Sequence, residues 1–208
     1  DDFQINPEEI EAKYFGVLTK LFNVARFASQ FDNPKDLDSV PTDLSIEDRW
    51  ILAEFSSTME KVEMGWAELD IYTATQALKT FGTGILPSHW LEMSKSRLYD
   101  GDTNAAWTIH RIVRDLMAAL SPVCPFFTHH ISSTLYGDSA VDAREFPKRT
   151  PNDDTLRSLT NAIEEFNGAT WRTKKESGLS LNAPISGIVI PDELIDFTSI
   201  LTQMHKLE

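Results

Sequence analysis

The sequence predicts a mainly α-helical protein: an antiparallel helix bundle with a small α/β appendage at the C-terminal end. Apolar residues recur every three or four positions in five long segments, which is the spacing of amphipathic helices. Most of these segments are joined by short loops that contain proline, glycine or aspartate. Each apolar stripe must be buried against a neighbouring helix, and an antiparallel bundle achieves this with short connections.

The first predicted helix begins at Asn6 and ends near Ala28. Asn6 is the expected N-cap, with Pro7 at the first helical position and Glu9 completing a capping box. The apolar stripe of this helix consists of Ile10, Tyr14, Val17, Leu21, Val24 and Ala28. A loop over residues 31–43, which contains two prolines, follows the helix.

Two more helices are predicted before residue 100. One begins at Ser45, with Asp48 three positions later, and extends to Leu69. The next begins at Asp70, and its apolar register continues to Tyr99. Because glycines and a proline disturb helical geometry, we expect a kink or short break where they interrupt this register, at Gly82, Gly84 and Pro87.

The second half of the chain predicts two long helices and the appendage. Thr103 is the expected cap of a helix that extends to Leu135, bent at the prolines in its middle. Another helix covers residues 152–176 and is terminated by Gly178. A short strand, Ile188-Val189-Ile190, and a last helix from Pro191 complete the appendage. We therefore expect a bundle over residues 1–148 and a C-terminal region over residues 149–208.

Composition restricts the function. Hydrophobic residues make up 41% of the 208 residues and charged residues 25%, as in ordinary globular proteins. There are 19 Lys and Arg against 32 Asp and Glu, for a net charge of −13. Such a chain cannot attract a polyanion through its average field, so nucleic-acid binding must depend on local cations. No apolar run approaches the roughly 20 residues that cross a bilayer, so we expect a soluble, cytoplasmic protein with no membrane partner.

The reactive residue types form no recognisable catalytic or metal motif. Cys124 is the single cysteine, and its apolar neighbours favour a buried structural thiol. His129 and His130 are adjacent, so on a helix they point about 100° apart and cannot easily share an ion. No glycine-rich phosphate loop follows a strand. We predict no catalytic residue, no metal site and no bound cofactor in this chain.

One group of residues in the first helix has the chemistry of an RNA-binding surface. Lys20, Asn23 and Arg26 recur at three-residue spacing on a face rotated from the apolar stripe, near Phe27 and Phe31. Unpaired RNA bases stack on aromatic rings while polar side chains bind base edges and phosphates. A solvated helix face with Phe27 packed inside explains the spacing equally well.

A second group of cations lies near the end of the helix over residues 152–176. It consists of Arg172, Lys174 and Lys175. Cations at this position complement the helix dipole, and they could equally bind phosphates. Composition alone does not decide between these two roles.

Several motifs in a fixed order carry a family resemblance. Lys20–Phe27 resembles K-L-W-N-x-x-R-F, Asp48–Leu52 reads D-R-W-I-L, Trp90–Tyr99 resembles Y-I-E-x-x-K-x-R-L-Y, and Leu120–Thr128 resembles L-A-P-x-x-P-F-x-T. This series is similar to the anticodon-binding helical domain of class Ia aminoacyl-tRNA synthetases. The segment Trp171–Pro184 most resembles the junction region of archaeal-type valyl-tRNA synthetases.

Met93–Ser96 matches four of the five letters of the KMSKS loop, which contacts ATP in class I synthetases. Glu92 stands where the first lysine of that loop belongs, and the flanking residues continue a helix. We interpret the match as coincidental, since the segment also fits the helical motif above. ATP binding by the isolated chain would support the opposite interpretation.

The resemblance implies the tRNA-binding part of a valine–tRNA ligase, with the anticodon stem and loop as partner. The implied tRNA contacts are those of the two cation groups and their aromatic neighbours: Lys20, Asn23, Arg26, Phe27, Phe31, Arg172, Lys174 and Lys175. The catalytic and editing domains, which would use ATP and Mg²⁺, lie outside this chain, so the fragment alone should be inactive. An isoleucine–tRNA ligase and a helical protein-interaction module without an RNA role are the alternatives.

Overall fold

The computed structural model describes residue 8 and residues 11–208 of the chain. Within these residues it contains helices and loops and no strand. In chain order, the helical elements are a π-helical turn η1 (Glu11–Phe15), α2 (Gly16–Ala28), α3 (Ile46–Ala67), α4 (Ile71–Thr80), a π-helix η2 (Phe81–Trp90), α5 (Leu91–Tyr99), α6 (Thr103–Leu120), α7 (Pro125–Tyr136), a 3₁₀ turn η3 (Val141–Ala143), α8 (Asp154–Ser158), α9 (Thr160–Glu176), a 3₁₀-helix η4 (Asp192–Phe197) and α10 (Thr198–His205).

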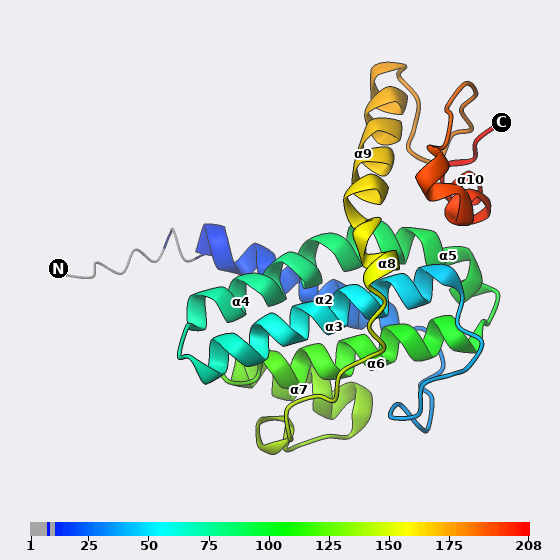
Figure 1. The fold of residues 1–208 in the computed structure, drawn as a ribbon. Coiled ribbons are helices and arrows are strands. Elements are labelled where there is room, and N and C mark those ends of the chain that lie inside the picture. Colours follow the sequence, from blue (N-terminus) through cyan, green and yellow to red (C-terminus); the bar gives the residue numbers. More distant parts are fainter. Residues whose placement is uncertain (1–7, 9–10) are drawn as a thin grey trace.

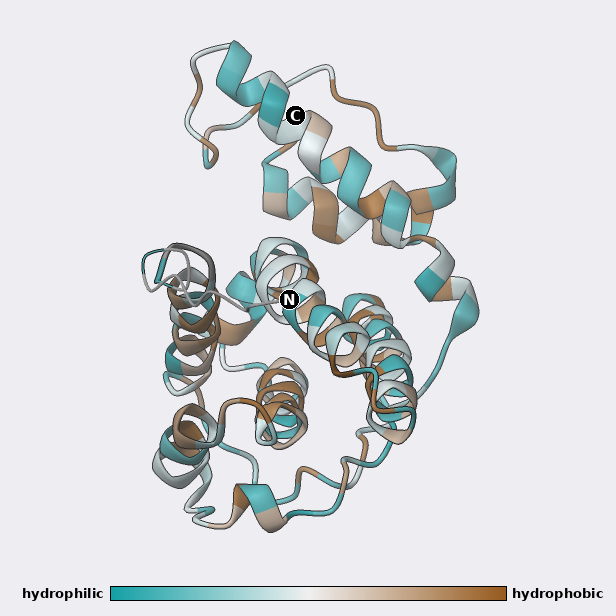
Figure 2. Ribbon diagram, turned by 90° about the vertical axis from the view of Figure 1, so that its left-hand side faces the viewer, coloured by the Kyte–Doolittle hydropathy of each residue, from teal (hydrophilic) through white to brown (hydrophobic). Residues whose placement is uncertain are grey.

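Elements α2 to α7 form the predicted helix bundle, and α9 stands upright beside it (Figure 1). Helix α3 packs against α4, η2 and α6, and α6 also packs against α2 and α7. Viewed along the bundle, the helices enclose a common interior (Figure 2). That interior is filled by large apolar side chains that are almost fully buried, including Trp50, Phe55, Met59, Leu78, Phe81, Leu86 and Trp90. The predicted bundle is therefore confirmed.

The interruption predicted between residues 82 and 87 is a change of helix type. Helix α4 passes directly into the π-helix η2, which continues into α5 without a loop. Gly82 lies against the neighbouring helices, since a Cβ atom at this position would come within 2.7 Å of Leu21 Cδ2. The absence of a side chain at Gly82 thus allows α2 to approach the π-helix closely.

The helix predicted from Thr103 to Leu135 is two helices. Helix α6 ends at Leu120 and α7 begins at Pro125, so the proline-containing segment forms a turn rather than a bend. The predicted cap is also wrong by one residue. The carboxylate of Asp102 accepts hydrogen bonds from the backbone amides of Asn104 and Ala105, which makes Asp102 the N-cap of α6.

Other details of the predicted helices need correction. The predicted start of the first helix at Asn6 lies outside the described residues, and Tyr14 of its stripe is exposed. The predicted strand over residues 188–190 does not form: Val189 is 84% exposed, and the described residues contain only one isolated bridge, between Ile185 and Leu207. Cys124 is half-buried rather than buried, and this partial burial raises the pKa of its thiol.

The C-terminal unit, residues 154–208, consists of α8, α9, η4 and α10 with the loop between α9 and η4. Leu194, Phe197 and Leu201 are buried between this unit and the bundle core, and Phe197 meets Trp50 edge to face at 6.4 Å. Gly178 ends α9 with a positive φ of 69°, as its position predicts. The domain boundary at residue 148 stays a prediction.

An arginine at the end of α5 connects three elements of the bundle. The Arg97 guanidinium bonds to Glu47 and Asp48 of α3, both at 2.7 Å, and to Asp102 at 2.8 Å. Asp48 also accepts a hydrogen bond from Trp90 Nε1. Burial raises the pKa of Asp48, and the bonds from Arg97 oppose that effect.

Candidate nucleic-acid interface

Three aromatic rings gather where α2 ends and α5 ends. Phe27 and Phe31 meet edge to face with ring centroids 5.0 Å apart, and Tyr99 lies 5.6 Å from Phe31 and 6.2 Å from Phe27. We call these residues the aromatic triad. The two phenylalanines are half-buried, whereas Tyr99 is 65% exposed. The triad therefore offers ring surface to solvent beside the polar face of α2.

A groove of about 670 Å³ lies on one side of the triad. We call it the first groove. It is bounded by α2, η2, α5 and the C-terminal unit, and its polar and aromatic lining includes Lys20, Asn23, Phe27, Lys95, Trp171 and Asn182. The structure thus brings three residues of the predicted α2 group together with side chains from the far end of the chain.

Two arginines, one on α2 and one on α9, lack ion-pair partners among the described residues. Arg26 and Arg172 are exposed, and neither has a carboxylate partner among the residues that the structure describes. Every other arginine of the chain is engaged in such a pair. Lys20 and Lys175 are likewise exposed, and Lys95 is paired with Glu92. Cations without a carboxylate partner can bind phosphate without first breaking an ion pair.

Lys174 requires a correction, because it does not belong to this exposed set. It is fully buried, and its ammonium group donates hydrogen bonds to the carbonyl oxygens of Leu181, at 2.8 Å, and His205, at 2.7 Å. Burial lowers the pKa of Lys174, and the charge of Lys206 adds to this effect. Lys174 therefore fixes the loop after α9 to the end of α10, and its ammonium is not on the surface.

A buried polar network holds the C-terminal unit against η2. The Asn167 amide nitrogen lies 2.9 Å from His89 Nδ1, and its amide oxygen lies 2.8 Å from His205 Nε2. Trp171 packs against both imidazoles, with ring centroids at 5.8 and 5.6 Å. Burial lowers the pKa of His89, and burial together with the charge of Lys174 lowers the pKa of His205 to about 4. Both imidazoles are therefore neutral at pH 7.

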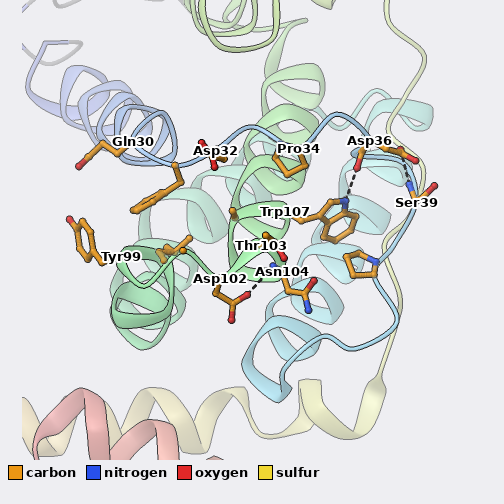
Figure 3. A pocket seen from close by; sticks show the side chains of 15 residues that line it. Gln30, Asp32, Pro34, Asp36, Ser39, Tyr99, Asp102, Thr103, Asn104 and Trp107 are labelled. Carbon is orange, nitrogen blue, oxygen red and sulfur yellow. Dashed lines mark hydrogen bonds between the residues drawn. The ribbon is translucent and has the colours of Figure 1, made fainter.

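A second groove, of about 640 Å³, lies on the other side of the triad (Figure 3). It lies between the segment that follows α2 and the turn from α5 to α6. Phe31 and Tyr99 of the triad contribute to its wall. Its charged lining residues are the aspartates Asp32, Asp36 and Asp102. The triad thus lies between the two grooves, with Phe27 in the first and Phe31 and Tyr99 in the second, and the grooves differ in charge.

The segment Met93–Ser96 does not provide a phosphate-binding loop. It lies in the middle of α5, where Met93 and Ser94 are buried and Ser94 Oγ donates to the Trp90 carbonyl. Lys95 is paired with Glu92, the acidic residue that departs from the loop motif. These residues do not fit an ATP polyphosphate, and the predicted helical continuation is confirmed.

The sequence motifs also contain residues whose role is structural. In the D-R-W-I-L segment, Asp48 binds Arg97, Arg49 pairs with Asp153 at 2.8 Å, and Trp50 Nε1 donates to Thr160 Oγ1. Their contacts explain why these residue types occur together: they join α3 to α5, to the start of α8 and to α9. These motifs therefore identify the fold more directly than they identify a binding site.

Sequence reasoning did not assign Tyr99, Trp171 or Lys95 to the site. Tyr99 closes the R-L-Y motif and Trp171 opens the C-terminal motif, but neither position showed which helix it would face.

Within the described chain, no helix has both the length and the apolar character needed to span a bilayer. No group of three metal-ligating side chains occurs in that same part.

Comparison with known proteins identifies the family. Residues 48–189 match the model of the family described as the anticodon-binding domain of tRNA ligase. Among curated proteins, the chain is 33% identical over 189 residues to the valine–tRNA ligase of Saccharolobus solfataricus, covering 89% of this chain and 22% of the relative. It is 34% identical over 180 residues to the valine–tRNA ligase of Methanothrix thermoacetophila, covering 84% of this chain and 20% of the relative.

The chain therefore spans about a fifth of the length of these relatives. The matched residues extend from the third residue of α3 through α9, that is, over most of the bundle and the helix that carries Trp171 and Arg172. The helical fold agrees with the one that the sequence motifs predict for such a domain. The chain belongs to the family of anticodon-binding domains of tRNA ligases.

Proposed function

We propose that this chain is the tRNA-binding part of a valine–tRNA ligase and that it binds the anticodon stem and loop in the first groove. The observation that carries the proposal is the meeting of Lys20, Asn23 and Phe27 with Trp171 in one groove. Cations, amides and aromatic rings together are the groups that bind single-stranded RNA. The family match and the valine–tRNA ligases among the relatives support valine as the amino acid.

In this proposal, Lys20, Arg26, Arg172 and Lys175 bind phosphates around the loop. Asn23 and Asn182 face the same groove and can donate to and accept from base edges. Phe27 and Trp171 supply ring surface inside this groove, and Phe31, which meets Phe27 edge to face, supplies it next to the groove. The net charge of −13 does not oppose this arrangement, because phosphate binding depends on the local cations.

The remainder of the polypeptide would activate valine with ATP and Mg²⁺ and transfer it to the 3′ end of the tRNA in the cytoplasm. Binding the anticodon at a distance would position the acceptor end and so raise discrimination among tRNAs. The chain described here would contribute no catalytic residue to that reaction.

The test is a binding series with RNA hairpins that differ only in the anticodon. We expect the 208-residue chain to bind a hairpin with a valine anticodon more tightly than the others, with an affinity that falls as salt rises. Arg26→Gln and Arg172→Gln should each weaken binding and reduce the salt dependence, because each removes a phosphate contact. Lys61→Gln is the matched control, since Lys61 is an exposed cation that lines neither groove.

Equal affinity for all anticodons at moderate salt would contradict the proposal. If no hairpin binds to the chain at any salt concentration, the result would favour the helical protein-interaction module instead. If the chain prefers hairpins with isoleucine anticodons, it would instead be the tRNA-binding part of an isoleucine–tRNA ligase.

A further inference from the structure

Four exposed apolar side chains gather at the turn that joins α3 to α4. Met64, Leu69, Ile71 and Tyr72 are each at least half exposed, and Leu69 is 83% exposed. Single exposed apolar residues are normal on a globular protein, whereas a contiguous group marks a surface that contacts another molecule. We call these four residues the turn patch.

Leu69 adopts a backbone conformation that leucine rarely takes. Its φ is 59°, in the left-handed region, where the Cβ atom crowds the following carbonyl oxygen and glycine or asparagine is the usual residue at a helix end. Because the Leu69 side chain is mostly exposed, contacts within the described structure do not offset this cost. Strained residues that persist in a fold cluster at functional sites. A contact outside the chain therefore explains a leucine at this position, whereas the stability of the turn does not.

The turn is held rigidly, so the patch is preformed. A Cβ atom at Gly65 would lie 2.9 Å from the Asp70 carbonyl oxygen and 2.9 Å from Ala74 Cβ, which shows how closely α4 approaches α3. The Asp70 carboxylate accepts a hydrogen bond of 3.0 Å from the Thr73 amide and caps α4. These contacts on both sides fix the backbone around Leu69 in its left-handed conformation.

The charge around the turn patch restricts its partner. The segment from Val62 to Leu78 contains no Lys, Arg or His, and it carries Glu63, Glu68 and Asp70. Arg149, from the connection to the C-terminal unit, is already paired with Glu63 at 2.9 Å. RNA phosphates would be repelled here, and a second copy of the chain would bring the same carboxylates to the contact. The patch therefore fits a protein surface with an apolar centre surrounded by lysine and arginine.

The position of the turn patch indicates where that protein surface comes from. The turn lies at the end of the bundle where α2 begins, away from the ends of α2 and α5 that carry the aromatic triad (Figure 1). Polypeptide that precedes α2 in a longer protein would reach the bundle at this end. The valine–tRNA ligases similar to this chain are about five times as long as the part that it matches. A ligase of that length therefore contains a large body of protein that can cover the patch.

We propose that the turn patch docks on the part of the ligase polypeptide that lies outside this chain, with Leu69 and Tyr72 packed against an apolar surface and Glu68 paired with a cation at its rim. This inference rests on the proposed function, which makes the chain part of a longer ligase. It assigns to the turn the task of holding the tRNA-binding domain in a fixed orientation. Anticodon binding can position the acceptor end only if the two parts of the ligase are held rigidly to each other.

The experiment compares the oxidation of side chains by hydroxyl radicals in the 208-residue chain and in the complete ligase that contains it, both without RNA. Met64 and Tyr72 are exposed and oxidisable, and mass spectrometry of their peptides measures the rate. We expect both rates to fall several-fold in the complete ligase. Tyr99 is the internal control, because it is 65% exposed at the other end of the bundle and should keep its rate.

Leu69→Asn separates backbone strain from docking. Asparagine tolerates the left-handed conformation, so the variant should raise the denaturant midpoint of the isolated chain. In the complete ligase it should restore much of the oxidation of Tyr72, because an apolar contact is lost. Val189→Asn is the matched control, since Val189 is 84% exposed and lies in the C-terminal unit, and it should change neither measurement.

Unchanged oxidation of Met64 and Tyr72 in the complete ligase would overturn this inference, while the anticodon series on the isolated chain decides the proposed function separately. Protection that appears in the isolated chain at high concentration would assign the patch to a second copy, and protection that requires added tRNA would assign it to RNA. Either result overturns the inference. A lower midpoint in Leu69→Asn would show that Leu69 stabilises the turn itself, which likewise contradicts it.

Discussion

The bundle and the C-terminal unit each enclose a long cationic side chain, but they balance its charge differently. In the bundle, Arg97 is surrounded by the carboxylates of Glu47, Asp48 and Asp102. In the C-terminal unit, the ammonium of Lys174 bonds to two backbone carbonyl oxygens. The imidazole of His205, whose backbone carbonyl accepts one of these bonds, is kept neutral by burial and by the charge of Lys174.

This difference predicts how each region responds to acid and to substitution. A guanidinium surrounded by carboxylates keeps its charge at every ordinary pH, so the bundle network changes only when the carboxylates are protonated. The network of the C-terminal unit fails once its imidazoles become charged. Protonation of His89 Nδ1 removes the lone pair that accepts from the Asn167 amide, and protonation of His205 Nδ1 places a buried charge without a hydrogen-bond partner near Lys174. We therefore expect the C-terminal unit to separate from the bundle under conditions in which the bundle remains folded.

The largest effect should come from Arg97→Ala. The substitution leaves two buried carboxylates without a counter-charge and should lower the free energy of unfolding by about 3–5 kcal/mol. Arg49→Ala is the control, because its pair with Asp153 is half-exposed and should contribute about 1 kcal/mol or less. Denaturant unfolding measures both values. Similar losses in the two variants would show that Arg97 is not the connection that the bundle depends on.

Acid should weaken the C-terminal unit next. The folded-state pKa of His205 is about 4, below its unfolded value of about 6.5, so the unfolded state binds more protons between these values. Stability should therefore be complete above pH 6.5 and fall as the pH approaches 4, by roughly 3 kcal/mol if His205 titrates alone. The fluorescence of Trp171, which contacts both imidazoles, reports the change.

The histidines allow a direct control for this pH dependence. His205→Gln should reduce the loss of stability between pH 6.5 and 4, whereas His129→Gln should not, because His129 is exposed. An unchanged pH profile in His205→Gln would contradict the role given to the buried imidazole.

Two neighbouring lysines provide a smaller and more local comparison. Lys174→Met removes the donor from two carbonyl groups and should cost about 2 kcal/mol, mainly in the stability of the C-terminal unit. Lys175→Met changes an exposed side chain and should alter stability by no more than about 0.5 kcal/mol. Hydrogen exchange of the α10 amides measures the local effect. Equal protection of the α10 amides in the two variants would show that Lys174 does not stabilise the C-terminal unit.

The smallest effect on stability should come from Arg26→Gln. Because Arg26 is exposed and has no ion pair among the described residues, the free energy of unfolding should change by about 0.5 kcal/mol or less. RNA binding should nevertheless weaken, as the proposed function requires. A large decrease in the free energy of unfolding would instead show that Arg26 stabilises the bundle.

The sequence was informative about helices because apolar spacing directly reflects burial. Leu21, Val24 and Ala28 are buried as their spacing predicts. The same reasoning placed Lys20, Asn23 and Arg26 on the exposed face, where they are found. It did not reveal the aromatic triad, because Tyr99 comes from a helix far along the chain and meets Phe27 only in the folded bundle.

Lys174 shows where such patterns fail. It is buried with Asn167 and Thr170 on one face of α9, at helical spacing, but all three are polar and form no apolar stripe. The run Ile188–Ile190 fails for the opposite reason: its residue types favour a strand, but no neighbouring strand in the described structure pairs with it. Local preference in both cases was overridden by contacts that only the folded chain provides.

The π-helix Phe81–Trp90 sets the directions in which the side chains of α5 point, because α4, the π-helix and α5 follow one another without a loop. Each of its turns encloses one residue more than an α-helical turn, so α5 leaves it in a different orientation than a continuous α-helix would. Removing a single residue at Gly84, where no neighbouring atom is close, would turn Arg97 and Tyr99 by about 100°. Insertions and deletions in this short segment would therefore change the charge network and the aromatic surface together, although both residues lie beyond the end of the π-helix.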